Sequence, residues 1–465
     1  MVFLSDMPDE TLERIFEFVT NDRESLETVS LVNRRFNKIV FPLLVCQWSN
    51  SQECCEPCIE RFSLHLLRNP HLRKQVGRLD LGYLRPLHDH DPDSADLSTE
   101  SLAALATTAK RDLSVSSFLS THLSHRIRLG CEDAVAVLIL AWATRLSDLH
   151  ITIPSLCPEI RQHFMPLLYA KEAICRLLDE PAEMTKYLPL GQVRHVTLQH
   201  WNREEIFGMR YARVFFHLPN IESICTHGMY DDFEEEFEDS DVDLTATASD
   251  DYTLPFPVGT STVRKIIITR AGSLKTGLLD FISACRTLKK LVIHVDQNLA
   301  NYHMPDEKDL AEAIMQHKDS LEELDLDMNY YVSLRGDDVL KETYRHLPHL
   351  WSLAVSITDL FEMVPSVGGE DDIKIVLDRI PRDIQVLMPH NYGFIYSWIS
   401  HDVFMEPYLE GIIELLEETG PEGRFSKLRI LDLSRTFVHD PAMVDIKKIK
   451  ELAISRRVKV MLHGK

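Results

Sequence analysis

The sequence predicts an α/β protein with a small all-α unit at its N-terminus, followed by an irregular α/β solenoid with a curved, mostly parallel sheet. Three observations lead to this prediction. A short apolar pattern recurs between residues 76 and 462, segments with helical periodicity precede several of its copies, and the first 48 residues contain only short amphipathic helical patterns. Repetition of this kind indicates a solenoid.

The recurring pattern is apolar-x-x-apolar-x-apolar. Its alternation in steps of two is typical of a short strand that buries one face. Clear copies occupy residues 76–81, 146–151, 193–198, 263–268, 288–293, 321–326, 350–355 and 428–433. Looser copies occupy residues 221–226 and 384–389, and residues 458–462 are expected to form the last strand.

Apolar residues at helical spacing precede three of these strands, at 278–285, 310–314 and 409–416. The apolar run at 134–143 (AVAVLILAWA) is expected to be a buried helix. This succession of helix and strand resembles a leucine-rich-repeat solenoid, whose usual period is about 20–29 residues. From Ile221 to Leu428 the copies start 25 to 44 residues apart, and the asparagine usual in that family is mostly absent. The repeats are therefore degenerate, and a non-repeat α/β domain stays open as an alternative.

The first helix of the N-terminal unit is expected to start at Pro8, because proline is well tolerated in the first turn of a helix. Leu12, Ile15, Phe16 and Val19 follow on one helical face. A second amphipathic helix starts near residue 25, and a third, shorter segment covers residues 40–45. About 45 residues are too few to form a comfortable core alone, which makes a partner physically plausible.

These residues resemble an F-box. The resemblance rests on Leu4-x-x-Met7-Pro8-x-Glu10-x-Leu12-x-x-Ile15-Phe16, on the run 29–36 (VSLVNRRF) and on 41–44 (FPLL), with Met7 in place of the usual leucine. It implies a surface that binds the Skp-type adapter of a cullin–RING ubiquitin ligase. The residues it assigns to that surface are Leu4, Met7, Pro8, Leu12, Ile15, Phe16, Leu31, Val32 and Phe36. The alternative is that these helices only close an N-terminal subdomain.

An F-box joined to degenerate repeats is the layout of F-box proteins with leucine-rich repeats, including divergent fungal ones. We therefore expect an F-box-like helical domain at 1–48, a helical connector at 49–75 and a repeat domain at 76–465. The resemblance implies a non-catalytic substrate receptor of an SCF-type ligase. Its partners would be the Skp-type adapter, through it the cullin–RING ligase, and a protein substrate. A repeat scaffold independent of ubiquitin ligation is the alternative.

Substrate is expected on the strand face, where the residues between the apolar positions point, and on the loops after the strands. The candidates are His195, Gln199, Trp201, Lys265, Lys290, His294, Glu323, Asp325, Asp327, Tyr330 and Tyr392. This face is predicted to become acidic near 323–327. Large aromatic residues on a rigid scaffold make good interface anchors, although some of these would serve only to cover the core.

The formal net charge of −22 disfavours a broad nucleic-acid or anionic-membrane surface. Half of this excess lies in residues 231–251, which hold eleven Asp and Glu and no Lys or Arg. Such a segment is expected to be a disordered acidic insertion. Ser240 and Ser249 precede acidic residues within it and are candidate phosphorylation sites.

The chemistry of a catalytic or metal site is missing from the sequence. The single C-x-x-C at 55–58 lacks a second pair for zinc, and the His-Asp run at 88–91 is expected to be a solvated loop. Phosphate-binding, dinucleotide-binding and nucleophile-elbow motifs are absent. We therefore expect no cofactor and no metal. Nine scattered cysteines and the acidic start of the chain predict a cytoplasmic or nuclear protein.

Overall fold

The computed structural model describes residues 4–19, 23–50, 59–84, 97–113, 116–154, 164–202, 205–231, 254, 256–274, 276–296, 305–328, 339–364, 372–390, 401–436 and 446–462. The chain divides into two compact units. Unit 1 comprises Met1–Gly228 and Asp232–Pro257, and unit 2 comprises Met229–Asp231 and Val258–Lys465. Each unit is described separately below.

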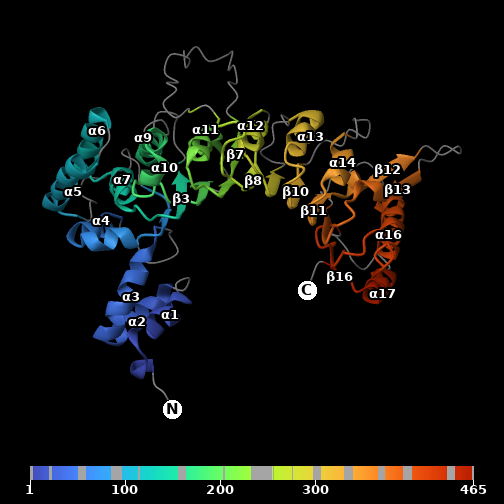
Figure 1. Cartoon of the computed structure of the whole chain (residues 1–465), viewed down its shortest axis with the longest axis horizontal. Helices are drawn as coiled ribbons and strands as arrows, with labels where there is room; N and C mark the ends of the chain where they lie inside the picture. Colours follow the sequence, from blue (N-terminus) through green and yellow to red (C-terminus); the bar gives the residue numbers. More distant parts are fainter. Residues whose placement is uncertain are drawn as a thin grey trace, which may run out of the picture. The chain divides into compact units, whose positions relative to one another are not determined.

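Unit 1 begins with three helices and continues with alternating helices and strands (Figure 1). Its helices are η1 (Leu4–Asp6), α1 (Asp9–Glu17), α2 (Arg23–Val32), α3 (Arg34–Cys46), α4 (Ile59–Arg68), η2 (Pro70–Gln75), α5 (Thr99–Asp112), α6 (Ser117–Arg128), α7 (Glu132–Trp142), α9 (Met165–Asp179), α10 (Ala182–Thr185), α11 (Arg210–Arg213) and η5 (Val214–His217). Its strands are β1 (Gln47–Ser49), β2 (Arg78–Leu81), β3 (Asp148–Ile153), β4 (His195–His200), β5 (Phe207–Gly208) and β6 (Ser223–His227).

Unit 2 repeats the same succession. Its strands are β7 (Met229–Tyr230), β8 (Lys265–Ala271), β9 (Lys290–Val295), β10 (Glu323–Asp327), β11 (Ser352–Ser356), β12 (Phe361–Val364), β13 (Asp372–Ile375), β14 (Val386–His390), β15 (Ile430–Asp432) and β16 (Lys459–Met461). Its helices are α12 (Gly277–Ala284), α13 (Glu307–Met315), α14 (Val339–Thr343), η7 (Tyr344–His346), α15 (Ile357–Leu360), η8 (Leu377–Arg379), α16 (His401–Glu417) and α17 (Ile446–Arg456).

The strands pair in parallel and in chain order within each unit. Unit 1 pairs β1, β2, β3, β4 and β6 in succession. Unit 2 pairs β8, β9, β10, β11, β14, β15 and β16 in the same way. Parallel strands joined by helices in strict order are the arrangement of a leucine-rich-repeat-like solenoid, so the predicted fold class is confirmed.

Each of the eleven predicted strands is present, and each begins within two residues of the position that the apolar pattern gives. The two inward apolar positions are buried, as Leu79 and Leu81 in β2 and Leu324 and Leu326 in β10 illustrate. The helices cover these positions, and Figure 1 shows α12 and α13 along one side of β8–β10. The residues of the other face are partly exposed in most strands, as Asp80 in β2 and Asp325 in β10 illustrate, whereas Ser352 and Ala354 in β11 are buried.

Helix α7 is buried on all sides, as its continuous apolar run predicts. It packs against α4, α6 and α9. Its first turn contains buried Asp133, which pairs with Arg126 of α6 at 2.8 Å and accepts a hydrogen bond from the backbone N–H of Met165. Among the features that were not predicted are strand β1 and an antiparallel hairpin of β12 and β13 inserted between β11 and β14.

Candidate functional site

The three N-terminal helices share one small core. Leu12 and Phe16 from α1, Leu26 from α2, and Phe36 and Val40 from α3 form a buried cluster. The rings of Phe16 and Phe36 meet edge to face, with centroids 5.6 Å apart. This cluster joins the segments that the F-box resemblance covers, so those segments form one folded element (Figure 1).

Burial divides the nine predicted adapter-binding residues into two groups. Leu12, Phe16 and Phe36 are at most 7 % exposed and hold the helices together, so we correct their assignment from partner contact to core. Leu4, Ile15, Leu31 and Val32 are exposed, as is Pro8, and Met7 is partly buried against the cluster. A helical apolar pattern cannot distinguish these groups, because both consist of apolar residues at helical spacing.

The start of α1 and the end of α2 meet at Arg35, the second residue of α3. The Arg35 guanidinium donates hydrogen bonds to the carbonyl oxygen of Met7 and to the Asp9 carboxylate. Asn33, directly after Val32, caps α3 by accepting a hydrogen bond from the backbone N–H of Phe36 at 2.8 Å. The Met7-Pro8 turn and the Leu31-Val32 end of α2 are therefore both held beside the start of α3.

Phe18 is a further exposed apolar residue that sequence reasoning missed. It follows the last residue of α1, and 89 % of it is exposed, compared with 84 % of Leu31 and 63 % of Val32. The signal was its position two residues after buried Phe16, which places an aromatic residue off the buried face. We refer to Leu4, Ile15, Phe18, Leu31 and Val32 as the exposed apolar set.

The strand face of unit 1 carries three of the predicted substrate-binding residues. His195 lies at the start of β4, and Gln199 donates a hydrogen bond to the Thr152 hydroxyl at 3.1 Å. Trp201 follows β4, is 46 % exposed, and packs against the Tyr83 ring at a centroid distance of 5.3 Å. Exposed Trp201 and half-buried Tyr83 together form an aromatic pair beside this face.

Sequence reasoning missed a polar row on the same face. Ser49, Asp80 and His150 occupy matching positions on β1, β2 and β3. Asp80 accepts from the Ser49 hydroxyl at 2.7 Å and lies 3.0 Å from the His150 ring nitrogen. Burial alone would raise the pKa of Asp80, but the hydrogen bond and charge of His150, with Ser49 and Arg78, hold it below its usual value.

The strand face of unit 2 brings six predicted residues together on three adjacent strands: Lys265, Lys290, His294, Glu323, Asp325 and Asp327. Lys290 pairs with Glu323, and His294 lies 2.9 Å from Asp325. Lys290 lies directly opposite Glu323 in the strand register, whereas His294 lies opposite Asp327 and reaches Asp325 diagonally. The three carboxylates of β10 make this face acidic as expected near 323–327, and the Lys290 ammonium neutralises part of that charge.

His390 ends β14 beside this group and is 2 % exposed. Burial is the main reason that its pKa is lowered to about 4. The nearby Asp325 carboxylate raises the pKa, whereas Arg435 and His294 lower it, and a hydrogen bond with the backbone of Leu326 raises it. The ring is therefore neutral at physiological pH. His390 is the last residue of β14 and so belongs to the sheet.

Several predicted residues lie outside the described part of the chain. They are Tyr330, Tyr392, Ser240, Ser249, the C-x-x-C at 55–58, the His-Asp run at 88–91 and all of the acidic insertion except Asp231. Among the residues that the structure does describe, no group of three His, Cys, Asp or Glu side chains could hold a metal ion. Within the same residues, no helix is long and apolar enough to cross a membrane.

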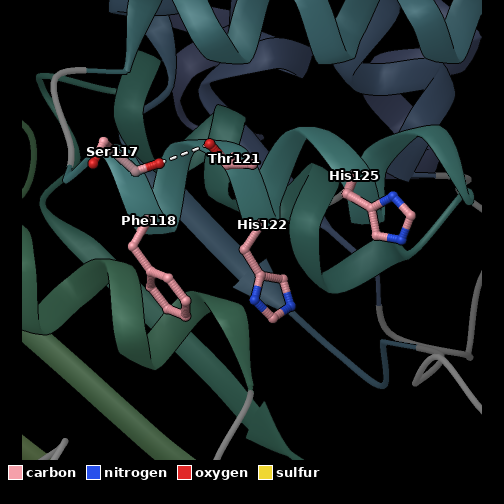
Figure 2. A pocket seen from close by; sticks show the side chains of 5 residues that line it. All are labelled: Ser117, Phe118, Thr121, His122 and His125. Atoms are coloured by element: carbon pink, nitrogen blue, oxygen red, sulfur yellow. Dashed lines mark hydrogen bonds between the residues drawn. The ribbon is translucent and has the colours of Figure 1, made fainter.

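A shallow hollow of about 630 Å³ lies on the outer side of α6 (Figure 2). The residues that line it are Ser117, Phe118, Thr121, His122 and His125, all from α6. Phe118 is 76 % exposed and meets the His122 ring edge to face, and the Thr121 hydroxyl donates to the Ser117 carbonyl at 2.8 Å. A hollow lined by one helix, without a buried polar group aimed into it, is a weak candidate for a small-molecule site.

Comparison with known proteins adds little to these observations. Neither the protein-family models nor the curated proteins give a match. A solved structure of an internalin, InlF from Listeria monocytogenes, aligns over 71 % of this chain and 70 % of that chain, with 11 % identity and a TM-score of 0.33. A TM-score this low supports no inference. The description as leucine-rich-repeat-like therefore rests on the strands and helices themselves.

Proposed function

We propose that this protein is the substrate receptor of an SCF-type cullin–RING ubiquitin ligase. Its N-terminal helices would bind the Skp-type adapter, and its strand face would bind a protein substrate. The observation that carries the proposal is the exposed apolar set on a three-helix unit whose sequence resembles an F-box. Exposed apolar patches on a folded protein mark interaction sites, and these five residues are candidates for such a patch.

The energy available from such docking is substantial. Full burial of a leucine or phenylalanine side chain contributes about 1.5–3 kcal/mol. Phe18 and Leu31 are both more than four-fifths exposed, so covering these two alone would contribute roughly 3–6 kcal/mol before the costs of association. An isolated three-helix unit has little other core, which favours its use as half of an interface.

The connection between the helices and the sheet suits a receptor, because adapter and substrate must be held at a defined separation. Helix α3 ends at Cys46 and strand β1 begins at the next residue. The carbonyl oxygen of Cys46 accepts a hydrogen bond from the backbone N–H of Gly77 at 3.0 Å. The rings of Trp48 and Phe62 stack with centroids 4.9 Å apart beside this junction.

The substrate side of the proposal rests on the strand faces. They present paired charges and the aromatic pair of Trp201 and Tyr83 on regular strands, which suits recognition of an exposed protein segment. No nucleic acid or membrane is proposed as a partner, because the chain carries a net charge of −22.

Co-purification with the Skp-type adapter tests the adapter half of the proposal. Wild type should retain the adapter, and Phe18→Asp and Leu31→Asp should lose it while remaining folded, because both side chains are exposed. The matched control is Leu178→Asp, at a leucine on α9 that is 55 % exposed. Failure of wild type to retain the adapter would favour the alternative, an interaction scaffold independent of ubiquitin ligation. Binding that survives both N-terminal substitutions would exclude Phe18 and Leu31 as the adapter contact.

The substrate half needs a separate experiment. A Leu31→Asp chain that no longer binds the adapter should keep its substrate bound without passing it on for ubiquitination. Proximity labelling with this variant should enrich one or more proteins whose abundance rises when the gene is deleted. The enrichment should be lost when Trp201→Ala is added, and its persistence would exclude the strand face of unit 1 as the contact.

A further inference from the structure

Helix α17 and the three residues after it carry a concentrated positive charge. Between Ile446 and Lys459 there are six Lys and Arg and a single carboxylate, Glu451, which gives this segment a net charge of +5. With −22 overall, the rest of the chain carries −27. The cations are Lys447, Lys448, Lys450, Arg456, Arg457 and Lys459, and every one of them is exposed. We refer to them as the α17 cations.

The structure separates this charge from the packing of the helix. Ile449 and Ala453 are buried, and α17 packs against α16 through that side. Ile454 lies on the outer side and is 77 % exposed. Lys447, Lys450 and Ile454 follow one another at helical spacing, so the outer face is a cationic stripe that ends in an apolar side chain.

The end of α17 holds Arg457 in an unfavourable backbone conformation. Its φ is +61°, in the left-handed region that favours glycine. The N–H of Arg457 donates to the carbonyl of Ile454 at 3.2 Å, and that of Val458 donates to the carbonyl of Ala453 at 3.0 Å, which closes the helix. Glycine would make this turn at lower cost, so an exposed arginine here supplies something other than fold stability.

Arg456 is also constrained. A Cβ atom built on Gly420 would lie 2.5 Å from its Nη1 atom, so the guanidinium lies directly against the backbone of this glycine. Lys447 is 82 % exposed, and it lies 4.0 Å from the Glu451 carboxylate, a distance at which solvent screens most of the attraction between two exposed side chains. The outer surface of α17 is therefore a cationic patch with little internal neutralisation.

We propose that the α17 cations and Ile454 form a docking surface for an extended acidic peptide segment of a partner protein, one that carries an apolar side chain among its carboxylates. The charge of the surface selects an anion. The exposed Ile454 favours a peptide over a nucleic-acid backbone, which offers no aliphatic or aromatic group at its charged surface. None of these residues belongs to the proposed adapter-binding or substrate-binding sets, so the inference does not depend on the proposed function.

The length of α17 and the electrostatic field of the whole chain also favour a short peptide as the partner. Eleven helical residues span about 16 Å, which matches about five residues of an extended strand. A DNA duplex or an anionic membrane extends well beyond such a patch and would meet the negative charge of the rest of the chain. A short acidic segment meets only the patch itself.

Binding of a defined peptide tests the proposal. The probe is a labelled peptide with the sequence DDFEEEFED, which corresponds to residues 231–239 and combines seven carboxylates with two phenylalanines. Anisotropy would be measured with the full chain, and with a full chain whose own Asp and Glu between 232 and 239 are replaced by Asn and Gln, so that this segment cannot compete. We expect saturable binding that weakens as the salt concentration rises, at least in the variant whose acidic residues between 232 and 239 are replaced.

Three variants show whether α17 is the site. Lys447→Glu with Lys450→Glu should weaken binding at least tenfold, and Ile454→Ser should weaken it about threefold, whereas the control Lys308→Glu with Lys318→Glu near α13 should leave it unchanged. Arg457→Gly should weaken binding and at the same time raise the melting temperature, which separates loss of a contact from loss of fold.

Three results would overturn the proposal. The first is that the labelled peptide shows no saturable binding to either chain when the chain is in 100-fold excess over the peptide. The second is that the α17 and α13 substitutions weaken binding equally. The third is that a 20-base-pair DNA or phosphatidylserine vesicles bind more tightly than the peptide.

Discussion

His390 should make unit 2 lose stability in mild acid. The ring is 2 % exposed and its pKa is lowered to about 4, whereas an unfolded chain has a histidine pKa of about 6.5. Between these values the unfolded state binds a proton that the folded state excludes. Stability is therefore complete above about pH 6.5 and falls as the pH drops toward 4.

The magnitude follows from the difference between the two pKa values. Each pKa unit corresponds to about 1.4 kcal/mol, so the free energy of unfolding falls by about 3 kcal/mol in full, and about 2 kcal/mol of this is lost by pH 5. Little solvent screening applies, because the ring is buried. The charged groups nearest to it are Asp325, Arg435 and His294, and their opposing effects leave burial as the dominant cause.

Urea unfolding of the full chain at pH 7.5 and pH 5 tests this reasoning. The variant His390→Gln cannot titrate, so its stability should fall about 2 kcal/mol less than that of wild type between the two pH values. His349→Gln, at an exposed position of unit 2, should behave like wild type. All other titrating groups are common to the three chains, so equal losses in wild type and His390→Gln would refute the argument.

Three further substitutions test other parts of the structure. Leu12→Ala should lower the free energy of unfolding by about 2–5 kcal/mol, because it opens a cavity in the N-terminal core; a change below 1 kcal/mol in urea would contradict that burial. Asp133→Ala should cost about 3–5 kcal/mol in the same measurement, since it leaves buried Arg126 without its carboxylate, and a neutral effect would show that the pair is dispensable. Asp359, which accepts from the Tyr344 hydroxyl at 3.1 Å, has a pKa raised to about 6 by burial, so its contribution is present in acid and lost as the pH rises through 6. Because its side chain is partly exposed, Asp359→Asn should be more stable than wild type by only about 1 kcal/mol at pH 8 and equal to it at pH 4; a constant difference would exclude titration as the cause.

The strands were predictable because burial dictates them. Each copy of the pattern places two apolar residues beneath the helices, and any shift by one residue would turn these toward solvent. Strand β1 escaped prediction because Trp48 is its single buried residue and the alternation is too short to recognise. The β12–β13 hairpin escaped because it interrupts the spacing between copies.

The candidate surfaces were only partly predictable. The sequence identifies apolar residues on α1 and α2, but tertiary packing decides that Leu12 is core and Leu31 is exposed. Likewise, Lys290 and Glu323 are 33 residues apart, and only the register of β9 with β10 pairs them. Long-range register and burial are properties of the folded chain, so single-sequence patterns do not encode them directly.

The most direct test of the central claim is a calorimetric titration of the purified full chain with the Skp-type adapter, at several temperatures. The account predicts one-to-one binding with a negative heat-capacity change, because apolar surface is buried, and loss of that binding in Leu31→Asp but not in Leu178→Asp. Absence of binding by wild type, or binding that Leu31→Asp and Phe18→Asp leave unchanged, would contradict the assignment of the N-terminal helices as an adapter-binding F-box.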